Sequence, residues 1–313
     1  MNQEHVSFLA LCDLRGVGFE TLKKVCAERV QFSSFFNPQE RQRLSSEDTL
    51  RSKFSRILEV LSTESARDEA LRAGRRKLEY FEQRGINLIF RNDNLYPKRL
   101  SDLQDPPHWL FVEGCVDALQ SSAVAAIGSR KVTADGKWLA TYFGYCLKDL
   151  NVVTVSGLAE GIDQIVHRAS LAAGLPTIAV LGTGILLNYP KGSEALREEI
   201  IEGGGCIVTE YLPKDSFSAR SFVRRNRIQA ALGHVVFPIE WGIKSGTAHT
   251  VKFASEINRP IVYARTPMQP LQDWIPSNLL HNSIRITLPQ AHNEFLKFIR
   301  DSLSSEPAQK TLF

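Results

Sequence analysis

Short apolar, β-branched runs alternate with helix-period patterns through the second half of the chain. Six runs predict strands, and a helical pattern follows each of the first five. The strands are expected at residues 124–127, 152–155, 177–181, 206–209, 235–239 and 260–263, and the helices at 135–150, 161–173, 193–202, 221–232 and 247–256. This order predicts an α/β fold with a parallel sheet, helices on both faces, and ligand-binding loops at the carboxyl ends of the strands.

The first half of the chain has mainly helical patterns. Apolar positions recur at helical spacing over residues 1–36, interrupted by Gly16 and Gly18. This resembles a helix-hairpin-helix or sterile-alpha-like module, in which glycine N–H groups can approach a DNA phosphate. The alternative is that the glycines only permit a sharp turn between helices. Residues 45–61 predict a helix capped by Ser45 or Ser46, and residues 66–84 predict a charged helix.

These patterns divide the chain into four segments. Residues 1–84 form a helical N-terminal domain, and residues 85–121 form a connector with strands at 86–90 and 109–112. Residues 122–290 form the core, which ends in a strand-like run at 283–288. Residues 291–313 are expected to form a C-terminal helix, which begins near residue 290, and a disordered tail.

Composition excludes several classes of protein. The 313 residues carry a net charge of only +4, so a nucleic-acid site must come from local clustering of positive charge. Five scattered cysteines without a CxxC pair predict reduced thiols in a cytoplasmic protein rather than disulfides or structural zinc. No signal-type run or membrane-spanning stretch is found in the sequence, so no membrane association is expected.

The loops after the predicted strands carry residue types that bind a polyanion. Gly128-Ser129-Arg130 follows the first strand, where unpaired N–H groups and a guanidinium favour anions. Taken alone, an ordinary strand-to-helix turn explains this tripeptide better. However, residues 220–227 add four arginines, no acid, and an aromatic ring that can stack on a base. Glycine, serine and lysine recur at residues 244–247.

Motifs at these strand ends resemble those of the DNA-processing protein A (DprA/Smf) family. In order, they are Gly128-Ser129-Arg130, residues 156–163 with His167, residues 181–184 with Tyr189-Pro190, Thr209-Glu210, Phe222 to Arg227, and Glu240 with residues 245–247 and Thr250. Residues 96–100 also fit the family. The resemblance departs at Tyr263–Pro267, where relatives usually have a Pro-Gly pair, and at Glu160, where many have a basic residue. Residues 265–313 are expected to be too short for the winged-helix domain of some relatives.

The resemblance implies an extended Rossmann-like core that binds single-stranded DNA. It also implies a homodimer that protects this DNA and loads a RecA-type recombinase during DNA uptake, as in natural transformation, or recombination. No cofactor is expected. Gly128 and Ser129 would form the floor of the site, with Arg130 and the 222–227 segment as its walls. The predicted DNA-binding residues are Gly128, Ser129, Arg130, Gly157, Arg220, Phe222, Arg224, Arg225, Asn226, Arg227, Lys244, Ser245, Gly246 and Thr247.

Candidate catalytic groups are few, so the chain is predicted not to be an enzyme. Asp163 and His167 lack a third metal ligand, and we expect Asp163 to organise a helix start above a packed His167. Glu210 and Glu240 are expected to hydrogen-bond backbone or arginine groups. The alternative function is a nucleotide-binding sensor or nucleoside-monophosphate hydrolase of the related Rossmann-like group, which the arginine-rich segment disfavours.

The last residues also resemble a docking motif. Gln309, Leu312 and Phe313 match the Gln-x-x-Leu-Phe pattern by which bacterial replication proteins bind the sliding clamp. The alternative is a frayed C-terminus without a partner.

Overall fold

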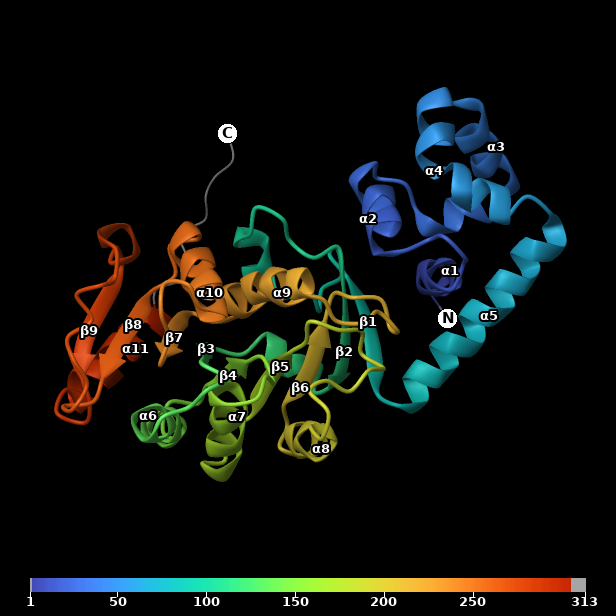
Figure 1. Cartoon of the computed structure of the whole chain (residues 1–313). Coiled ribbons are helices and arrows are strands. Elements are labelled where there is room, and N and C mark those ends of the chain that lie inside the picture. Colours follow the sequence, from blue (N-terminus) through green and yellow to red (C-terminus); the bar gives the residue numbers. More distant parts are fainter. Residues whose placement is uncertain (1, 305–313) are drawn as a thin grey trace. The chain divides into compact units, whose positions relative to one another are not determined.

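The computed structural model describes residues 2–304 and divides the chain into two compact units, which Figure 1 colours along the sequence. The smaller unit takes the residues up to 90 together with 108–111, and the larger takes 91–107 and the residues from 112 on. The domain boundaries predicted at residues 84, 121 and 290 stay a prediction. Between residues 2 and 304, no helix combines the length and the apolarity that crossing a bilayer requires.

The smaller unit is mainly helical. Its elements are α1 (Gln3–Cys12), α2 (Phe19–Ala27), the short 3-10 helix η1 (Phe32–Phe35), α3 (Pro38–Ser46), α4 (Asp48–Val60), α5 (Glu64–Gln83) and β1 (Ile86–Phe90). The predicted pair of helices around two glycines is confirmed. Gly16 has a φ of 82°, which favours glycine, and Gly18 is the residue before α2. The sequence therefore identified this turn correctly.

One predicted helix cap is wrong. Ser45 and Ser46 lie in the last turn of α3, and their hydroxyls donate to the carbonyls of Arg41 and Gln42 at 2.9 and 2.8 Å. Helix α4 begins after Glu47, which makes no side-chain cap. A proline in the first helical turn requires no N–H partner. Pro38 therefore starts an additional helix, α3, and this helix includes both serines.

The larger unit is built on a parallel sheet. Its strands are β3 (Ala123–Gly128), β4 (Val153–Ser156), β5 (Thr177–Val180), β6 (Cys206–Thr209), β7 (Val235–Ile239), β8 (Ile261–Arg265) and β9 (Ser283–Thr287). They lie in the order β6-β5-β4-β3-β7-β8-β9, and every neighbouring pair is parallel. The predicted parallel α/β fold is confirmed. Beyond the six predicted strands, β9 pairs with β8 at the strand-like run predicted for residues 283–288. Strand β2 (Trp109–Gly114) runs from the smaller unit into the larger.

Helices cover both faces of this sheet, as expected. Figure 1 shows α6 (Ala134–Cys146), α7 (Ile162–Ala172) and α8 (Glu194–Glu202) on one side, with α9 (Ala219–Leu232) and α10 (Gly246–Glu256) on the other. Helix α11 (His292–Ser304) joins the face of α6, where Phe237 lies 5.3 Å from the Phe143 ring and 5.7 Å from the Phe295 ring. These buried rings anchor the helices to the sheet.

The strand order reverses at β3. Strands β4, β5 and β6 lie on one side of β3, and β7, β8 and β9 lie on the other. In open parallel sheets, the chain leaves the carboxyl ends of the two central strands in opposite directions and opens a crevice there. The loops after β3 and β7, which carry Arg130 and Lys244, therefore border the place where a ligand of this fold is expected.

Candidate functional site

The turn after β3 is held from two sides. The Gly128 N–H donates to Oδ1 of Asp163 at 3.3 Å, and the Ser129 carbonyl accepts the N–H of Ile162 at 3.0 Å. Any side chain at position 128 would collide with the carbonyl of Ile239. Glycine is therefore required here by the close approach of β7, and the turn has a fixed backbone.

Ser129 and Arg130 differ in what they offer to a ligand. The Ser129 hydroxyl accepts the N–H of Lys131 at 3.0 Å and lies 2.7 Å from the Lys131 carbonyl, so it closes the turn. The Arg130 side chain is exposed, and its guanidinium carbon lies 5.5 Å from the centre of the Phe222 ring. A cation over an aromatic face is attracted by the electron-rich face of the ring. The structure thus brings together the predicted Arg130 and Phe222.

Phe222 belongs to a cluster of three rings. The Tyr189 ring lies 5.2 Å from Phe222 and 4.4 Å from Phe217, while Phe217 and Phe222 are 6.1 Å apart. Phe217 is 53% exposed. Gly182 lies against the Phe222 ring, because a Cβ added at Gly182 would lie only 2.6 Å from that ring. We call Tyr189, Phe217 and Phe222 the aromatic platform.

Two members of this platform are absent from the residues predicted to bind DNA. Tyr189 enters the prediction only as part of a Tyr-Pro motif, and Phe217 does not enter it. Phe217 precedes α9, so no helical spacing links it to Phe222. The available signal was the presence of two further aromatic residues in loops at the ends of neighbouring strands.

Arg225 is enclosed beneath the site. It is 4% exposed, and its Nη1 donates to the carbonyls of Gly157, at 2.8 Å, and Val180. Burial lowers the pKa of Arg225 to about 10, although nearby Asp163 favours the charged form. Gly157 has no room for a side chain, because a Cβ there would meet Arg225, Asp163 and Gln229. Arg225 therefore joins α9 to the ends of β4 and β5.

Arg227 is also buried, in an ion pair. Its two terminal nitrogens donate to Glu210 at 2.5 and 2.7 Å, and its Nε donates to the Asp105 carbonyl at 2.9 Å. Burial alone would lower the pKa of Arg227, but the hydrogen bonds and charge of Glu210 raise it above its ordinary value. The prediction that Glu210 binds an arginine of the site is confirmed. A direct DNA contact by Arg227 or Arg225 would require the side chain to be uncovered.

The remaining arginines of α9 are more accessible. Arg220, in the first turn, is exposed. Arg224 is partly buried, with Nη2 at 3.2 Å from Asp105 and Nε at 3.5 Å from Glu210. The structure therefore divides the arginine-rich segment into two enclosed members, one that is tied to carboxylates, and one that faces solvent.

The loop after β7 is connected to both other parts of the site. Both carboxylate oxygens of Glu240 lie 3.0 Å from the N–H of Thr133, which confirms the prediction that Glu240 binds backbone. The Asn226 amide on α9 donates to the Gly246 carbonyl at 3.1 Å. The loop therefore has a defined position relative to the Gly128–Arg130 turn and to α9.

The four predicted contact residues of this loop are not equally available. Lys244 and Gly246 are exposed, and Ser245 is half-buried at the start of α10. Thr247 is only 7% exposed. The positive charge of Lys244 and the N–H groups of the first turn of α10 are therefore the parts of this loop that a ligand can reach.

Asp163 and His167 are structural, as predicted. Burial raises the pKa of Asp163, against the opposing effects of Arg225 and the Gly128 N–H. His167 is fully buried, its Nδ1 lies 2.8 Å from the Thr177 hydroxyl, and burial lowers its pKa to about 3. His167 is therefore neutral at ordinary pH. In the part of the chain that the structure describes, no three histidine, cysteine or acidic residues gather as metal ligands.

The sequence matches the model of a known protein family. The model of the family described as "DNA recombination-mediator protein A" matches residues 87–292, well over half of the chain. Protein Smf of Escherichia coli K12 is 33% identical over 220 residues, which cover 70% of this chain and 59% of that protein. The DNA processing protein DprA of Streptococcus pneumoniae R6 is 37% identical over 169 residues, covering 54% and 59%. The chain thus spans somewhat over half the length of these curated relatives.

Two solved structures share the fold. The X-ray structure of DprA from Streptococcus pneumoniae superposes with a TM-score of 0.63 and 25% identity, over 93% of this chain and 96% of that one. DprA from Helicobacter pylori superposes with a TM-score of 0.58 and 27% identity, over 68% and 96%, and its structure describes a single-stranded DNA binding mode. The resemblance predicted from the motifs is confirmed.

Proposed function

Because the chain belongs to the DNA recombination-mediator protein A family, we propose that it binds single-stranded DNA at the carboxyl ends of β3 and β7. The observation that carries the proposal is the exposed Arg130 guanidinium lying over the Phe222 ring. A single strand offers unpaired bases and phosphates side by side. An aromatic face beside an arginine matches both of these groups.

Each accessible group has a role in this proposal. Arg130, Arg220 and Lys244 contact phosphates, and the backbone N–H groups around Gly128 and Gly246 add to this attraction. The aromatic platform stacks unpaired bases, which are covered by their neighbours in a duplex. The site therefore prefers single strands and has little sequence preference.

The buried groups support these contacts. Arg225 and Arg227 hold α9 in place through backbone carbonyls and Glu210. Asp163 binds the Gly128 N–H, and Glu240 binds the Thr133 N–H next to the same turn. A site whose parts are already in position loses less entropy when it binds a flexible strand.

Further parts of the proposal concern partners. We propose that the protein protects single-stranded DNA and loads a RecA-type recombinase in the cytoplasm, as a homodimer and without catalysis of its own. We also propose that Gln309, Leu312 and Phe313 dock on a sliding clamp; these three residues lie outside the described part of the chain. The resemblance of the whole motif set to the family supports the recombinase partner, and the terminal pentapeptide supports the clamp.

The alternative of a nucleotide sensor or nucleoside-monophosphate hydrolase has weaker support. In that alternative, Glu240 would act on a ribose. Both of its carboxylate oxygens instead lie 3.0 Å from the N–H of Thr133. A mononucleotide also has no use for three aromatic rings beside an exposed arginine.

A binding titration tests the proposed function. Fluorescent oligo-dT should bind. A plot of the logarithm of its association constant against the logarithm of salt concentration should be linear, with a slope of about −0.7 for each phosphate that the protein contacts. Duplex DNA of the same length is the control and should bind more weakly. Absence of oligo-dT binding at low salt, or equal affinity for the duplex, would contradict the proposal.

A further inference from the structure

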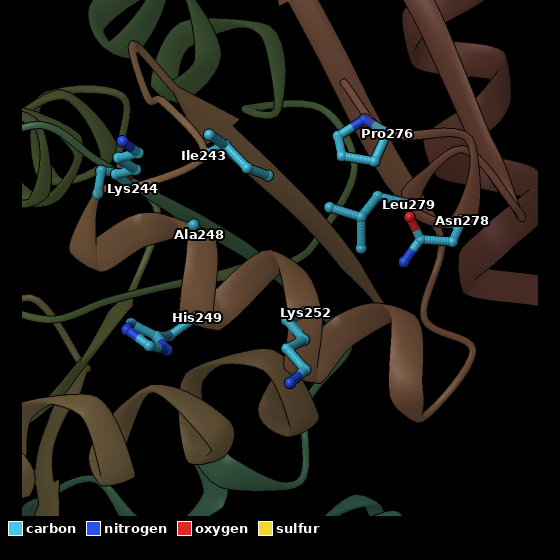
Figure 2. Close-up of a pocket in the computed structure, with 9 residues that line it drawn as sticks. Ile243, Lys244, Ala248, His249, Lys252, Pro276, Asn278 and Leu279 are labelled. Carbon is cyan, nitrogen blue, oxygen red and sulfur yellow. The ribbon is translucent and has the colours of Figure 1, made fainter. Parts of the chain in front are cut away.

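A hollow lies beside α10. Figure 2 shows it between α10 and the segment around the 3-10 helix η4 (Ser277–Leu279), and its volume is about 470 Å³. Its apolar walls come from both sides: Ile243 and Ala248 on one, Pro276 and Leu279 on the other. Apolar walls around a volume of this size suit a planar ring with a sugar attached.

The charged lining is positive. Lys244 and Lys252 line the pocket, His249 lines it as well, and among the described residues no carboxylate does. The nearest acid to Lys252 in an ion pair is Glu256, at 3.8 Å across one helical turn. Asn278 lies on the opposite side and carries both a hydrogen-bond donor and an acceptor. The pocket thus combines apolar walls, an amide and cations.

The pocket shares Lys244 with the proposed DNA site. Lys244 lines it and is also one of the accessible cations of the loop after β7. The Gly246 carbonyl, at the start of α10, accepts a hydrogen bond from Asn226. Asn226 lies one helical turn along α9 from Phe222 of the aromatic platform. Helix α9, which carries Phe222, is thus hydrogen-bonded to the first residue of α10, the helix that lines the pocket.

We propose that this pocket holds a nucleotide of the same DNA strand, beyond the bases that the aromatic platform stacks. The base lies between Ile243 and the Pro276–Leu279 wall, with Asn278 at its polar edge. Lys244 and Lys252 contact the phosphates on either side. The inference rests on the proposed function and extends it, because it gives the strand a second anchoring point and a direction across α10.

Filling the pocket tests the inference. Ala248→Trp places a large side chain in the hollow from the surface of α10, and Ala172→Trp, at an exposed position at the end of α7, is the matched control. The probes are oligo-dT strands of about 5 and about 20 nucleotides, chosen around the ~4–16 nucleotides that one single-strand-binding fold covers. Ala248→Trp should lower the affinity for the long strand by about tenfold and leave the affinity for the short strand unchanged. Ala172→Trp should change neither affinity.

Charge gives an independent variant. Lys252→Glu should lower the affinity for the long strand. It should also reduce the salt dependence of that affinity by the amount that corresponds to about one phosphate contact. Lys297→Glu on α11 should change neither quantity. With 4-thiothymidine in the long strand, ultraviolet cross-links should map to residues 243–252 or 276–279 and disappear in Ala248→Trp.

The outcomes separate this inference from the proposed function. If Arg130→Ala weakens DNA binding but the pocket variants bind the long strand like the unchanged protein, the inference is wrong and the function stands. If the unchanged protein binds neither strand, both are wrong. Cross-links that persist in Ala248→Trp would also overturn the inference.

Discussion

Arg227 donates two hydrogen bonds to Glu210, one from each terminal nitrogen, at 2.5 and 2.7 Å. Their side chains are only 5% and 2% exposed. The pair joins the middle of α9 to the residue after β6, and Arg224 approaches the same carboxylate at 3.5 Å. The helix that carries Phe222 is thus fixed to the sheet by buried charge.

Glu210→Ala should destabilise the larger unit. It leaves the Arg227 charge buried without its partner, which typically costs about 3–5 kcal/mol of the free energy of unfolding. Urea denaturation measures this change. The control is Glu199→Ala, which breaks an exposed pair with Arg168 and should cost less than about 1 kcal/mol. Equal stability of the two variants would show that the buried pair does not stabilise the fold.

Arg130→Ala should weaken single-strand binding without affecting folding. Loss of one charge-assisted contact corresponds to about 1–3 kcal/mol, or about 5–150-fold in the dissociation constant. Fluorescence anisotropy with oligo-dT measures it, and the thermal unfolding midpoint should stay unchanged because the side chain is exposed. Arg168→Ala, at another exposed arginine, is the control. An unchanged affinity would remove Arg130 from the site.

Phe217→Ala should weaken binding through lost stacking. A base stacked on an aromatic ring contributes about 1–3 kcal/mol, and Phe217 is the most exposed ring of the platform. The affinity for an abasic strand should be equal in Phe217→Ala and the unchanged protein, because such a strand has no base to stack. Tyr145→Ala removes an exposed ring on α6 and serves as the control. A similar loss with abasic DNA would argue against stacking.

One buried and one half-buried histidine should make the fold sensitive to acid. Burial lowers the pKa of His167 to about 3 and of His234 to about 4. The unfolded chain binds their protons below about pH 6.5, so stability falls as pH falls from there toward these values. The slope approaches about 1.4 kcal/mol per pH unit for the fully buried His167, and it is smaller for the half-buried His234 because solvent screens its surroundings.

His167→Gln separates this contribution from others. The raised pKa of Asp163 acts in the opposite sense, but it is present in both proteins and cancels in their difference. Urea midpoints between pH 4 and 7 should depend less on pH in His167→Gln than in the unchanged protein. Identical pH profiles would show that His167 does not titrate differently in the folded and unfolded states.

Deleting residues 309–313 should abolish co-purification with a bacterial sliding clamp. The proposed anchors are Gln309, Leu312 and Phe313, and a short peptide depends strongly on its apolar anchors. Oligo-dT affinity of the shortened chain is the control and should not change. If clamp binding persists, the C-terminal motif is not the docking site.

Some of these features could be predicted from local patterns. The strands that end at Thr209 and Ile239 have the predicted bounds, because β-branched runs between glycine-rich loops leave little choice of structure. The roles of Glu210, Glu240 and His167 were also predicted correctly. Ser45 and Ser46 were assigned wrongly, since a helix cap depends on which of two competing helices forms.

The sequence by itself determined the parallel α/β fold, its family, and the turn that contains Arg130. The fold follows from spacing and order along the chain, which strand and helix periodicity make readable, and the family follows from the resemblance of the motifs at the strand ends. Only the tertiary structure decided which arginines are accessible: Arg225 and Arg227 are enclosed, and Arg130 is exposed over Phe222. It also gathered Tyr189 and Phe217 beside that ring. Burial and ring contacts depend on groups distant in sequence, so no local pattern of residues could specify them.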